Sequence, residues 1–174
     1  MADHGLSGIL LVGGASSRFG SPKELAEFEG ETLAERAWRL LEDTCDERLA
    51  VGRGGLADPG TGPVAAIAAG LRAATNQIAV VIPIDMPLLT PTALRLLAAA
   101  CRDAATAQHG PLPCAVARRT LPAFETGELR LRAVLDGLDT ARIELEEKLL
   151  ANINEPSDLR KIAAAEDHRT MGGP

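Results

Sequence analysis

Aromatic side chains are scarce in this 174-residue chain, which has no Tyr, one Trp and three Phe. Proteins that bind single-stranded nucleic acid stack the bases on such side chains. The formal net charge of −6 also lacks the excess of Lys and Arg expected of a protein that binds a phosphate backbone. We therefore expect no nucleic-acid partner. Small anionic ligands stay possible, because backbone N–H groups, a few cationic side chains and a divalent cation can hold them.

Cysteine and histidine are equally few, with three of each, and they are scattered along the chain: Cys45, Cys101, Cys114, His4, His109 and His168. A disulfide framework needs an even number of cysteines, and a zinc cluster needs pairs of ligands at short spacing. The chain has neither. We interpret the cysteines as small buried or half-buried residues. The histidines alone define no metal site and no nucleophilic site.

Long apolar runs are also missing, since no stretch approaches the roughly 18 residues of a membrane-spanning helix. Residues 1–4 lack the basic flank and apolar core of a signal peptide. We therefore expect no membrane association and a cytoplasmic location. The length and the hydrophobic content of 46% fit one domain with one core. We predict that this domain covers residues 1–166 and that residues 167–174 form a disordered tail.

Short apolar segments alternate with helical patterns along the chain. The predicted strands are 6–12, 48–52, 78–82, 113–118 and 151–154, and the predicted helices are 32–43, 64–75, 91–107, 129–138 and 156–165. This alternation predicts an α/β fold, a single-domain three-layer sandwich with a mostly parallel, Rossmann-like sheet. The run 78–82 is apolar throughout and rich in β-branched residues, as expected for a central strand covered on both faces.

A glycine-rich loop, residues 13–23, follows the first predicted strand. Gly13 and Gly14 allow a sharp turn that brings backbone N–H groups close to a ligand, while Ser16, Arg18 and Lys23 add a hydroxyl donor and positive charge. Lysine occurs at only three positions of the chain, which draws attention to the one in this loop. The loop suits the phosphates of a nucleotide, although a surface lysine in an ordinary loop is the alternative.

A glycine-proline pair and an aspartate lie at two further junctions between predicted elements. Gly62 and Pro63 open the helix after the second strand, and Asp85 follows the buried run 78–82. Ligands of open α/β sheets bind outside the carboxyl ends of the strands, so the loop 13–23 and Asp85 should face one crevice. The alternative for Asp85 is a cap on the turn before Thr90.

Four short motifs are spread over residues 6–162: GGASSRFGSPK at 13–23, GPVAA at 62–66, PIDMP at 83–87 and NINEP at 152–156. In type and spacing they resemble the motifs of the molybdenum cofactor guanylyltransferase family of MobA-like nucleotidyltransferases. The resemblance implies a nucleotide-diphospho-sugar transferase-like fold. It also implies transfer of a nucleoside monophosphate from a nucleoside triphosphate to the terminal phosphate of molybdopterin, with release of pyrophosphate.

The resemblance further implies a role for each matching residue. Lys23 and Arg18 would neutralise phosphate charge, and Asp85 would bind Mg²⁺. The implied nucleotide site comprises Leu11, Val12, Gly13, Gly14, Ala15, Ser16, Lys23, Asp58, Gly62 and Asp85. The implied acceptor site comprises Asn152, Asn154, Arg118 and Arg130. Proteins of molybdenum cofactor biosynthesis, or molybdoenzymes, are the implied protein partners.

Plainer roles remain for several of these side chains. Arg18 could pair with Glu24 or Glu27 on the surface. The two asparagines could be turn residues that bond their own backbone, and the two arginines of the acceptor set could form a solvated basic patch.

The chain departs from the family pattern in the short segment 52–61, where Asp58 is the one acidic candidate for nucleoside binding. Val12 and Phe19 also replace the usual Ala and Met of the loop. The choice between GTP and CTP therefore stays open, as does a degenerate relative that binds a nucleotide without chemistry. A nicotinamide- or flavin-dependent enzyme is disfavoured, because the loop lacks the Gly-x-Gly-x-x-Gly spacing.

Overall fold

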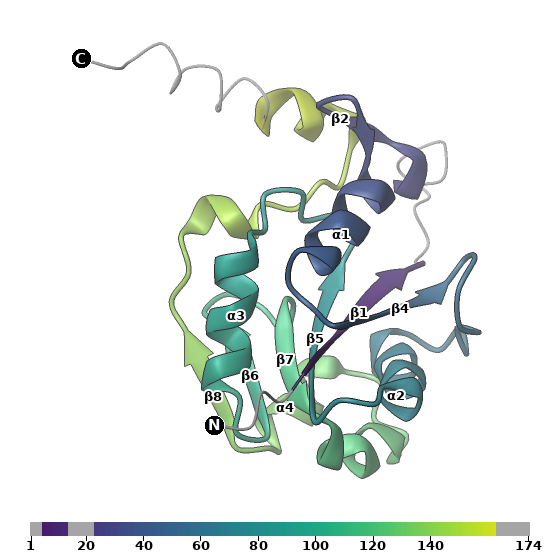
Figure 1. The fold of residues 1–174 in the computed structure, drawn as a ribbon, viewed down its shortest axis with the longest axis vertical. Helices are drawn as coiled ribbons and strands as arrows, with labels where there is room; N and C mark the ends of the chain where they lie inside the picture. Colours follow the sequence, from purple (N-terminus) through teal and green to yellow (C-terminus); the bar gives the residue numbers. More distant parts are fainter. Residues whose placement is uncertain (1–4, 14–22, 163–174) are drawn as a thin grey trace.

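Six strands form a sheet through the centre of the protein, in the order β4-β1-β5-β7-β6-β8 (Figure 1). The computed structural model describes residues 5–13 and 23–162. The strands are β1 (Leu6–Val12), β4 (Glu47–Gly52), β5 (Ile78–Pro83), β6 (Ala104–Ala107), β7 (Cys114–Ala117) and β8 (Thr140–Ile143). Among these six, β7 alone runs antiparallel to its neighbours. The mostly parallel α/β fold is therefore confirmed.

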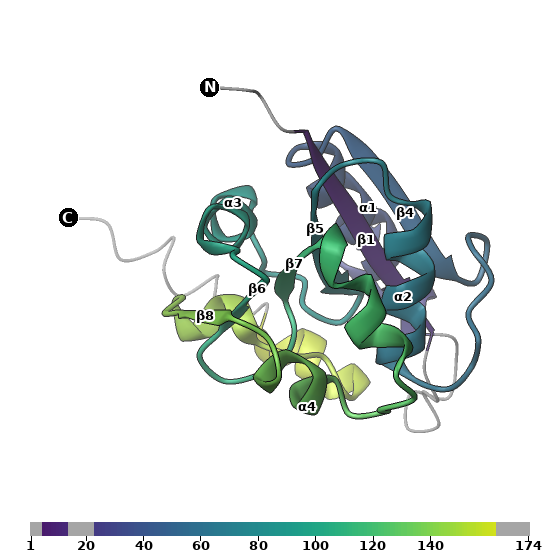
Figure 2. The same cartoon turned by 90° about the horizontal axis from the view of Figure 1, so that it is seen from below.

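Helices cover both faces of this sheet. One face carries α1 (Leu33–Glu42) and α3 (Pro91–Ala100), and the other carries α2 (Pro63–Ala73), α4 (Leu131–Asp136) and the 3₁₀ segment η2 (Arg118–Glu125). Figure 2 shows α3 on one side of the sheet and α4 on the other. Alternate strand residues enter the two cores, as the pleat requires: Ile9, Val81 and Val116 on the α2 side, and Leu10, Val80 and Ala115 on the α1 side.

A small hairpin and α1 form a third, separate packing unit. The strands β2 (Glu27–Phe28) and β3 (Glu31–Thr32) lead directly into α1, whose N-terminus is closed by a capping box between Thr32 and Glu35. Phe28 and Leu33 pack there on Ile153, close to the helical residues 156–162. Figure 1 shows this last helical segment beside β2, so the two distant parts of the sequence meet at one end of the molecule.

The predicted helix 91–107 is wrong in its second half. Helix α3 ends at Ala100, and residues 104–107 form β6, which is buried at every position between β7 and β8. The sequence there is rich in alanine, which favours helix, but its burial between two strands overrides that propensity. A fully buried strand shows no polar alternation, so periodicity does not reveal it.

Three further observations concern the strands. The predicted strand 113–118 is confirmed as β7, and the structure shows that it is antiparallel to its neighbours. The edge strand β8 lies in a polar segment that the sequence analysis left without structure. Residues 151–154 form no strand; instead the N–H of Ile153 donates to the carbonyl of Asp85, 2.8 Å away.

Two expectations about the whole chain meet the structure in part. Within residues 5–13 and 23–162, the helices are too short or too polar to cross a bilayer. The predicted tail 167–174 and the end of the predicted helix 156–165 lie outside the described residues.

A polar network around a buried serine holds the sheet at the end where β1 begins. Ser7 is fully buried, donates to the carboxylate of Glu47 on β4, and accepts from the amide of Asn76. The backbone N–H and the hydroxyl of Thr75 donate to the same carboxylate at 2.9 and 3.0 Å. Burial raises the pKa of Glu47, but these hydrogen bonds outweigh it and hold the pKa below its ordinary value of 4.5.

We expect Glu47→Gln to lower the free energy of unfolding at neutral pH by about 1–3 kcal/mol, because a charged acceptor with several donors is lost. A lowered carboxyl pKa contributes stability above the unfolded-state value, and this contribution disappears as pH falls through the folded-state value. The gap between wild type and variant should therefore close in urea titrations below pH 4.5. Glu42→Gln, which removes an exposed partner of Arg48, is the control and should change little. A gap that persists in acid would contradict this account.

Candidate functional site

The carboxyl ends of three neighbouring parallel strands meet at one edge of the sheet. Leu11 pairs with Pro83, and Val12 pairs with Gly52. Gly13 and Asp85 each lie two residues beyond the pair of Leu11 and Pro83, so the chain leaves β1 and β5 at the same level. This is the edge at which ligands of open α/β sheets bind.

An ion pair links the end of the glycine-rich loop to the end of β5. Lys23 begins the short 3₁₀ segment η1 (Lys23–Leu25), and its Nζ lies 3.0 Å from Oδ2 of Asp85. The side chains are only 15% and 25% exposed, so little water screens the pair. Capping of α3 is done by Thr90 itself, whose hydroxyl accepts from the N–H of Ala93. The structure thus brings together the lysine and the aspartate that the sequence placed in one crevice.

Asp58 and Gly62 lie on the side of β1 away from β5. A Cβ atom built on Gly13 would lie 3.2 Å from Oδ2 of Asp58, so this carboxylate stands directly against the end of β1. Its other oxygen accepts from the N–H of Gly60. Gly62 precedes α2 with φ of 106°, and Pro63 occupies the first turn. Of the predicted nucleotide site, Asp58 and Gly13 are thus neighbours at the end of β1, directly after Leu11 and Val12.

Several residues of the predicted nucleotide site fall outside the described part of the chain. They lie in the segment 14–22 and are Gly14, Ala15, Ser16 and Arg18. Their roles remain predictions.

A groove of about 370 Å³ opens beside Asp85 on the other side of β5. Its polar side chains are Asp85, His109 and Asn152, and its other lining residues are apolar or glycine, among them Met86 and Leu150. The bond from Ile153 to the carbonyl of Asp85 carries Asn152 into this groove. The predicted acceptor residue Asn152 is therefore next to Asp85.

Asn154 is exposed and does not line this groove. Its backbone N–H donates to the carboxylate of Asp158, 3.0 Å away. This bond uses the backbone of Asn154 and not its side chain, so the acceptor role of Asn154 stays a prediction. A bond of the kind that the turn interpretation expects occurs at Asn152, whose side-chain amide donates to the carbonyl of Leu150 at 3.4 Å.

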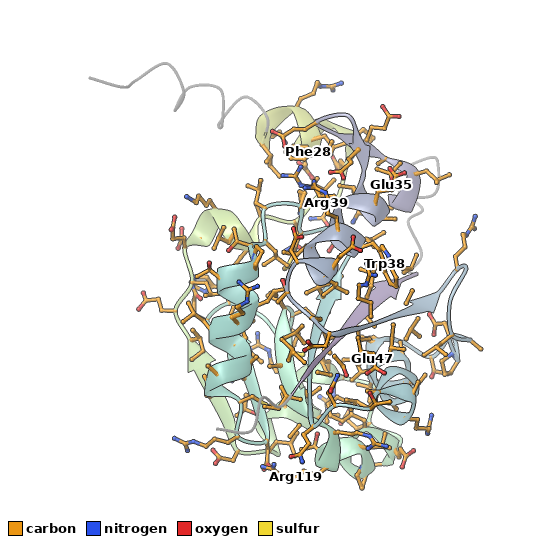
Figure 3. All side chains as sticks on the ribbon, viewed as in Figure 1. Phe28, Glu35, Trp38, Arg39, Glu47 and Arg119 are labelled. Atoms are coloured by element: carbon orange, nitrogen blue, oxygen red, sulfur yellow. The ribbon has the colours of Figure 1, made fainter. Side chains whose placement is uncertain are left out.

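The structure does not bring Arg118 to the predicted acceptor site. It follows β7, and its N–H donates to the carbonyl of Gln77, immediately before β5 begins. Figure 3 labels the neighbouring Arg119 at the opposite end of the molecule from Phe28. Because β7 runs antiparallel to β5, Arg118 lies beside the start of β5, at the edge of the sheet opposite Asp85.

Arg130 has a local partner instead of a place beside Asp85. Its side chain is 80% exposed and lies 3.1 Å from the carboxylate of Glu128. This side-chain hydrogen bond, aided by the backbone N–H of Arg130, lowers the pKa of Glu128 to about 2. The groove residues do not include Arg130, so the pair matches the surface interpretation.

The donor set at Asp85 is compatible with one kind of metal ion. Among residues 5–13 and 23–162, no group of three or more His, Cys, Asp or Glu side chains could enclose a metal. Mg²⁺ in phosphoryl-transfer sites is usually held by one or two carboxylates together with substrate phosphates and water. The carboxylate of Asp85, one oxygen of which contacts Lys23, fits this mode of binding. It does not fit a site in which protein side chains alone enclose the metal.

Gly52 shapes the edge of the sheet beside the end of β1, a role that its place at the end of a predicted strand does not show. Its φ is 115°, and a Cβ atom there would lie 1.7 Å from the carbonyl oxygen of Val12. The turn that follows folds back, with Leu56 donating its N–H to the carbonyl of Ala50. The sequence signal was present in the crowded glycines at 52, 54 and 55.

We expect Gly52→Ala to lower the free energy of unfolding by about 2–4 kcal/mol, because it adds a clash with Val12 to the strain of a positive φ. Gly54→Ala is the matched control. Its φ of 81° carries similar strain, but a Cβ there meets no atom within 4 Å. The control should lose about 1 kcal/mol in denaturant unfolding. Equal losses in both variants would show that close approach to β1 has no role.

Comparison with known proteins points to one family. The model of the MobA-like NTP transferase domain matches residues 8–143. Probable molybdenum cofactor guanylyltransferases of Chloroflexus aggregans and Mycobacterium avium are each 31% identical to this chain. The first match covers 91% of this chain and 94% of the relative, and the second covers 92% and 96%.

Two solved structures share the fold. Molybdopterin-guanine dinucleotide biosynthesis protein A from Archaeoglobus fulgidus has a TM-score of 0.77 and 24% identity, over 93% of this chain and 99% of that one. A nucleotidyl transferase from Methanothermobacter thermautotroptrophicus has a TM-score of 0.79 and 22% identity, over 97% and 99%.

Proposed function

Since the chain belongs to the family of MobA-like NTP transferase domains and is thus a nucleotidyltransferase, we propose that it transfers GMP from GTP to a molybdopterin-type acceptor. Pyrophosphate is the second product. The choice of guanine and of this acceptor rests on the names of the relatives, which are molybdenum cofactor guanylyltransferases.

The observation that carries the proposal is the ion pair of Lys23 and Asp85 at the border between two spaces. On one side lie Gly13, Asp58 and Gly62, and on the other lies the groove with Asn152. A nucleotidyl transfer needs two anionic reactants to meet at one phosphorus atom. The paired groups stand where a nucleotide on the first side would meet an acceptor on the second.

In the proposed reaction, an oxygen of the acceptor phosphate attacks the α-phosphorus of GTP. A new P–O bond forms, the bond from the α-phosphorus to the bridging oxygen of the β-phosphate breaks, and pyrophosphate leaves with that electron pair. Protein groups have little covalent work in such a transfer; they align the reactants and neutralise charge. Lys23 contributes its ammonium to the phosphates, and Arg18 and the N–H groups of the glycine-rich loop complete the cradle in this proposal.

Mg²⁺ belongs to the proposal as the ion that Asp85 would hold together with the triphosphate. When bound, it supplies positive charge to the phosphate oxygens. Lys23 has a second task here, because its contact with Oδ2 fixes the orientation of the Asp85 carboxylate.

We expect Lys23→Ala and Asp85→Asn each to reduce pyrophosphate release from GTP and molybdopterin by roughly 100-fold or more, since each removes charge stabilisation at the reacting phosphate. A coupled phosphate assay measures the rate. Lys148→Ala is the matched control, because this lysine pairs with Glu146 on the surface and should keep the wild-type rate. Wild-type rates in both site variants would refute the assignment of the site.

Thermal unfolding with GTP, CTP, ATP and UTP, each with and without Mg²⁺, tests the nucleotide. Ligand binding to the folded state raises the melting temperature in proportion to the logarithm of ligand concentration over Kd. We expect GTP with Mg²⁺ to give the largest rise. A larger rise with CTP would indicate a cytidylyltransferase, and a rise without pyrophosphate release would indicate a relative that only binds nucleotide.

A further inference from the structure

His109 lines the acceptor groove, and Glu147 lies beside it, just outside the residues that line the groove. Neither side chain has an established role. His109, from the connection between β6 and β7, lines the groove, and its Nε2 lies 3.6 Å from Oε1 of Glu147. Glu147 begins the 3₁₀ segment η3 (Glu147–Leu150), whose last residue also lines the groove. The side chains are 65% and 87% exposed, so both can reach a ligand.

The contact between these two side chains leaves most of their hydrogen-bonding capacity unused. A separation of 3.6 Å is within reach of charge attraction but too long for a hydrogen bond. In the described parts of the chain, neither side chain has another hydrogen bond or ion pair. A donor and an acceptor therefore stand side by side and open to solvent.

The neighbouring backbone is held in place by a two-point clamp. The side-chain amide of Gln108 donates to the carbonyl of Leu145 at 2.7 Å and accepts from its N–H at 3.0 Å. Leu145 is buried in the core on the α3 side of the sheet. The clamp joins the segment of His109 to the segment of Glu147, so the spacing of the pair depends on a fixed, partly buried bond.

The groove offers a largely apolar surface with polar groups at a few positions. Met86, Leu112 and Leu150 provide apolar surface, and polar side chains are confined to Asp85, Asn152 and His109. Asp85 lies at the proposed reaction centre. His109 lies on the connection between β6 and β7, whereas Asp85 follows β5. A ligand whose phosphate lies at Asp85 therefore contacts His109 with a different part of the molecule.

We propose that His109 and Glu147 form the subsite that reads the edge of a 2-amino-4-oxo heterocycle, the head of a pterin acceptor. The carboxylate of Glu147 accepts from the ring N–H and the 2-amino group, and Nε2 of His109 donates to the adjacent ring carbonyl. Because these ring groups are neighbours, they need a protein acceptor and a protein donor a few ångströms apart. Oε1 of Glu147 and Nε2 of His109 are 3.6 Å apart. This inference rests on the proposed function for the identity of the acceptor.

The test compares two fluorescent ligands bound to the full chain: 6-hydroxymethylpterin monophosphate and its lumazine counterpart, in which a 2-oxo group replaces the amino group. Wild type should bind the pterin about tenfold more tightly, because the lumazine carbonyl faces the Glu147 carboxylate. Glu147→Gln should remove or reverse this preference, since an amide can donate to the 2-oxo group. His109→Ala should weaken both ligands by about tenfold, because both keep the 4-oxo group.

Glu146→Gln is the matched control. It removes the exposed carboxylate of the residue before Glu147, which pairs with Lys148. This variant should bind both ligands as wild type does. Wild-type binding by Glu147→Gln and His109→Ala would overturn the subsite, as would failure of wild type to bind the pterin or to prefer it. Pyrophosphate release with molybdopterin is measured separately. If wild type releases no pyrophosphate with molybdopterin, the proposed function is refuted. If it does, and both variants keep the wild-type KM for the acceptor, only the subsite is refuted.

Discussion

The parallel pairing of β1 between β4 and β5 is the constraint on which the functional edge depends. Because β1 is buried on both faces, its alternate residues tie the two core layers together, and its register with both neighbours is fixed. That register ends the three strands at one level. The backbone of Gly52 then passes so close to Val12 that no side chain fits between them. Gly13 and Asp85 stand side by side because of this pairing.

Among the charge pairs within residues 5–13 and 23–162, that of Lys23 and Asp85 is distinguished by its burial. Pairs such as Arg102 with Asp139 are more than half exposed, so water and salt weaken them. Lys23 and Asp85 are both mostly covered, and they come from the first and third strands' ends. Their attraction therefore holds the start of η1 against the end of β5.

The sequence predicted those parts of the fold whose signals are local. The apolar runs of β1 and β5 and the capped, amphipathic α1 have such signals. The juxtaposition of Lys23 with Asp85 followed instead from the rule that ligands of open α/β sheets bind at the carboxyl ends of the strands. Strand direction is not local, so the sequence did not reveal that β7 is antiparallel or that Arg118 lies far from Asp85. The short strands β6 and β8 gain their stability from neighbours rather than from their own residues. Without β6, His109 had no recognisable position beside a groove.

Ile153 has a consequence for how the protein is made. This buried residue packs on Phe28 and Leu33, and its N–H bonds the carbonyl of Asp85, so it joins the last part of the chain to the first and to the middle. Contacts of such long sequence separation form late and slowly. On the ribosome, which delivers the N-terminal part first, the sheet edge can exist before residue 153 emerges. The groove beside Asp85 cannot, because Leu150 and Asn152 line it, and so translation completes the end of β1 before this groove.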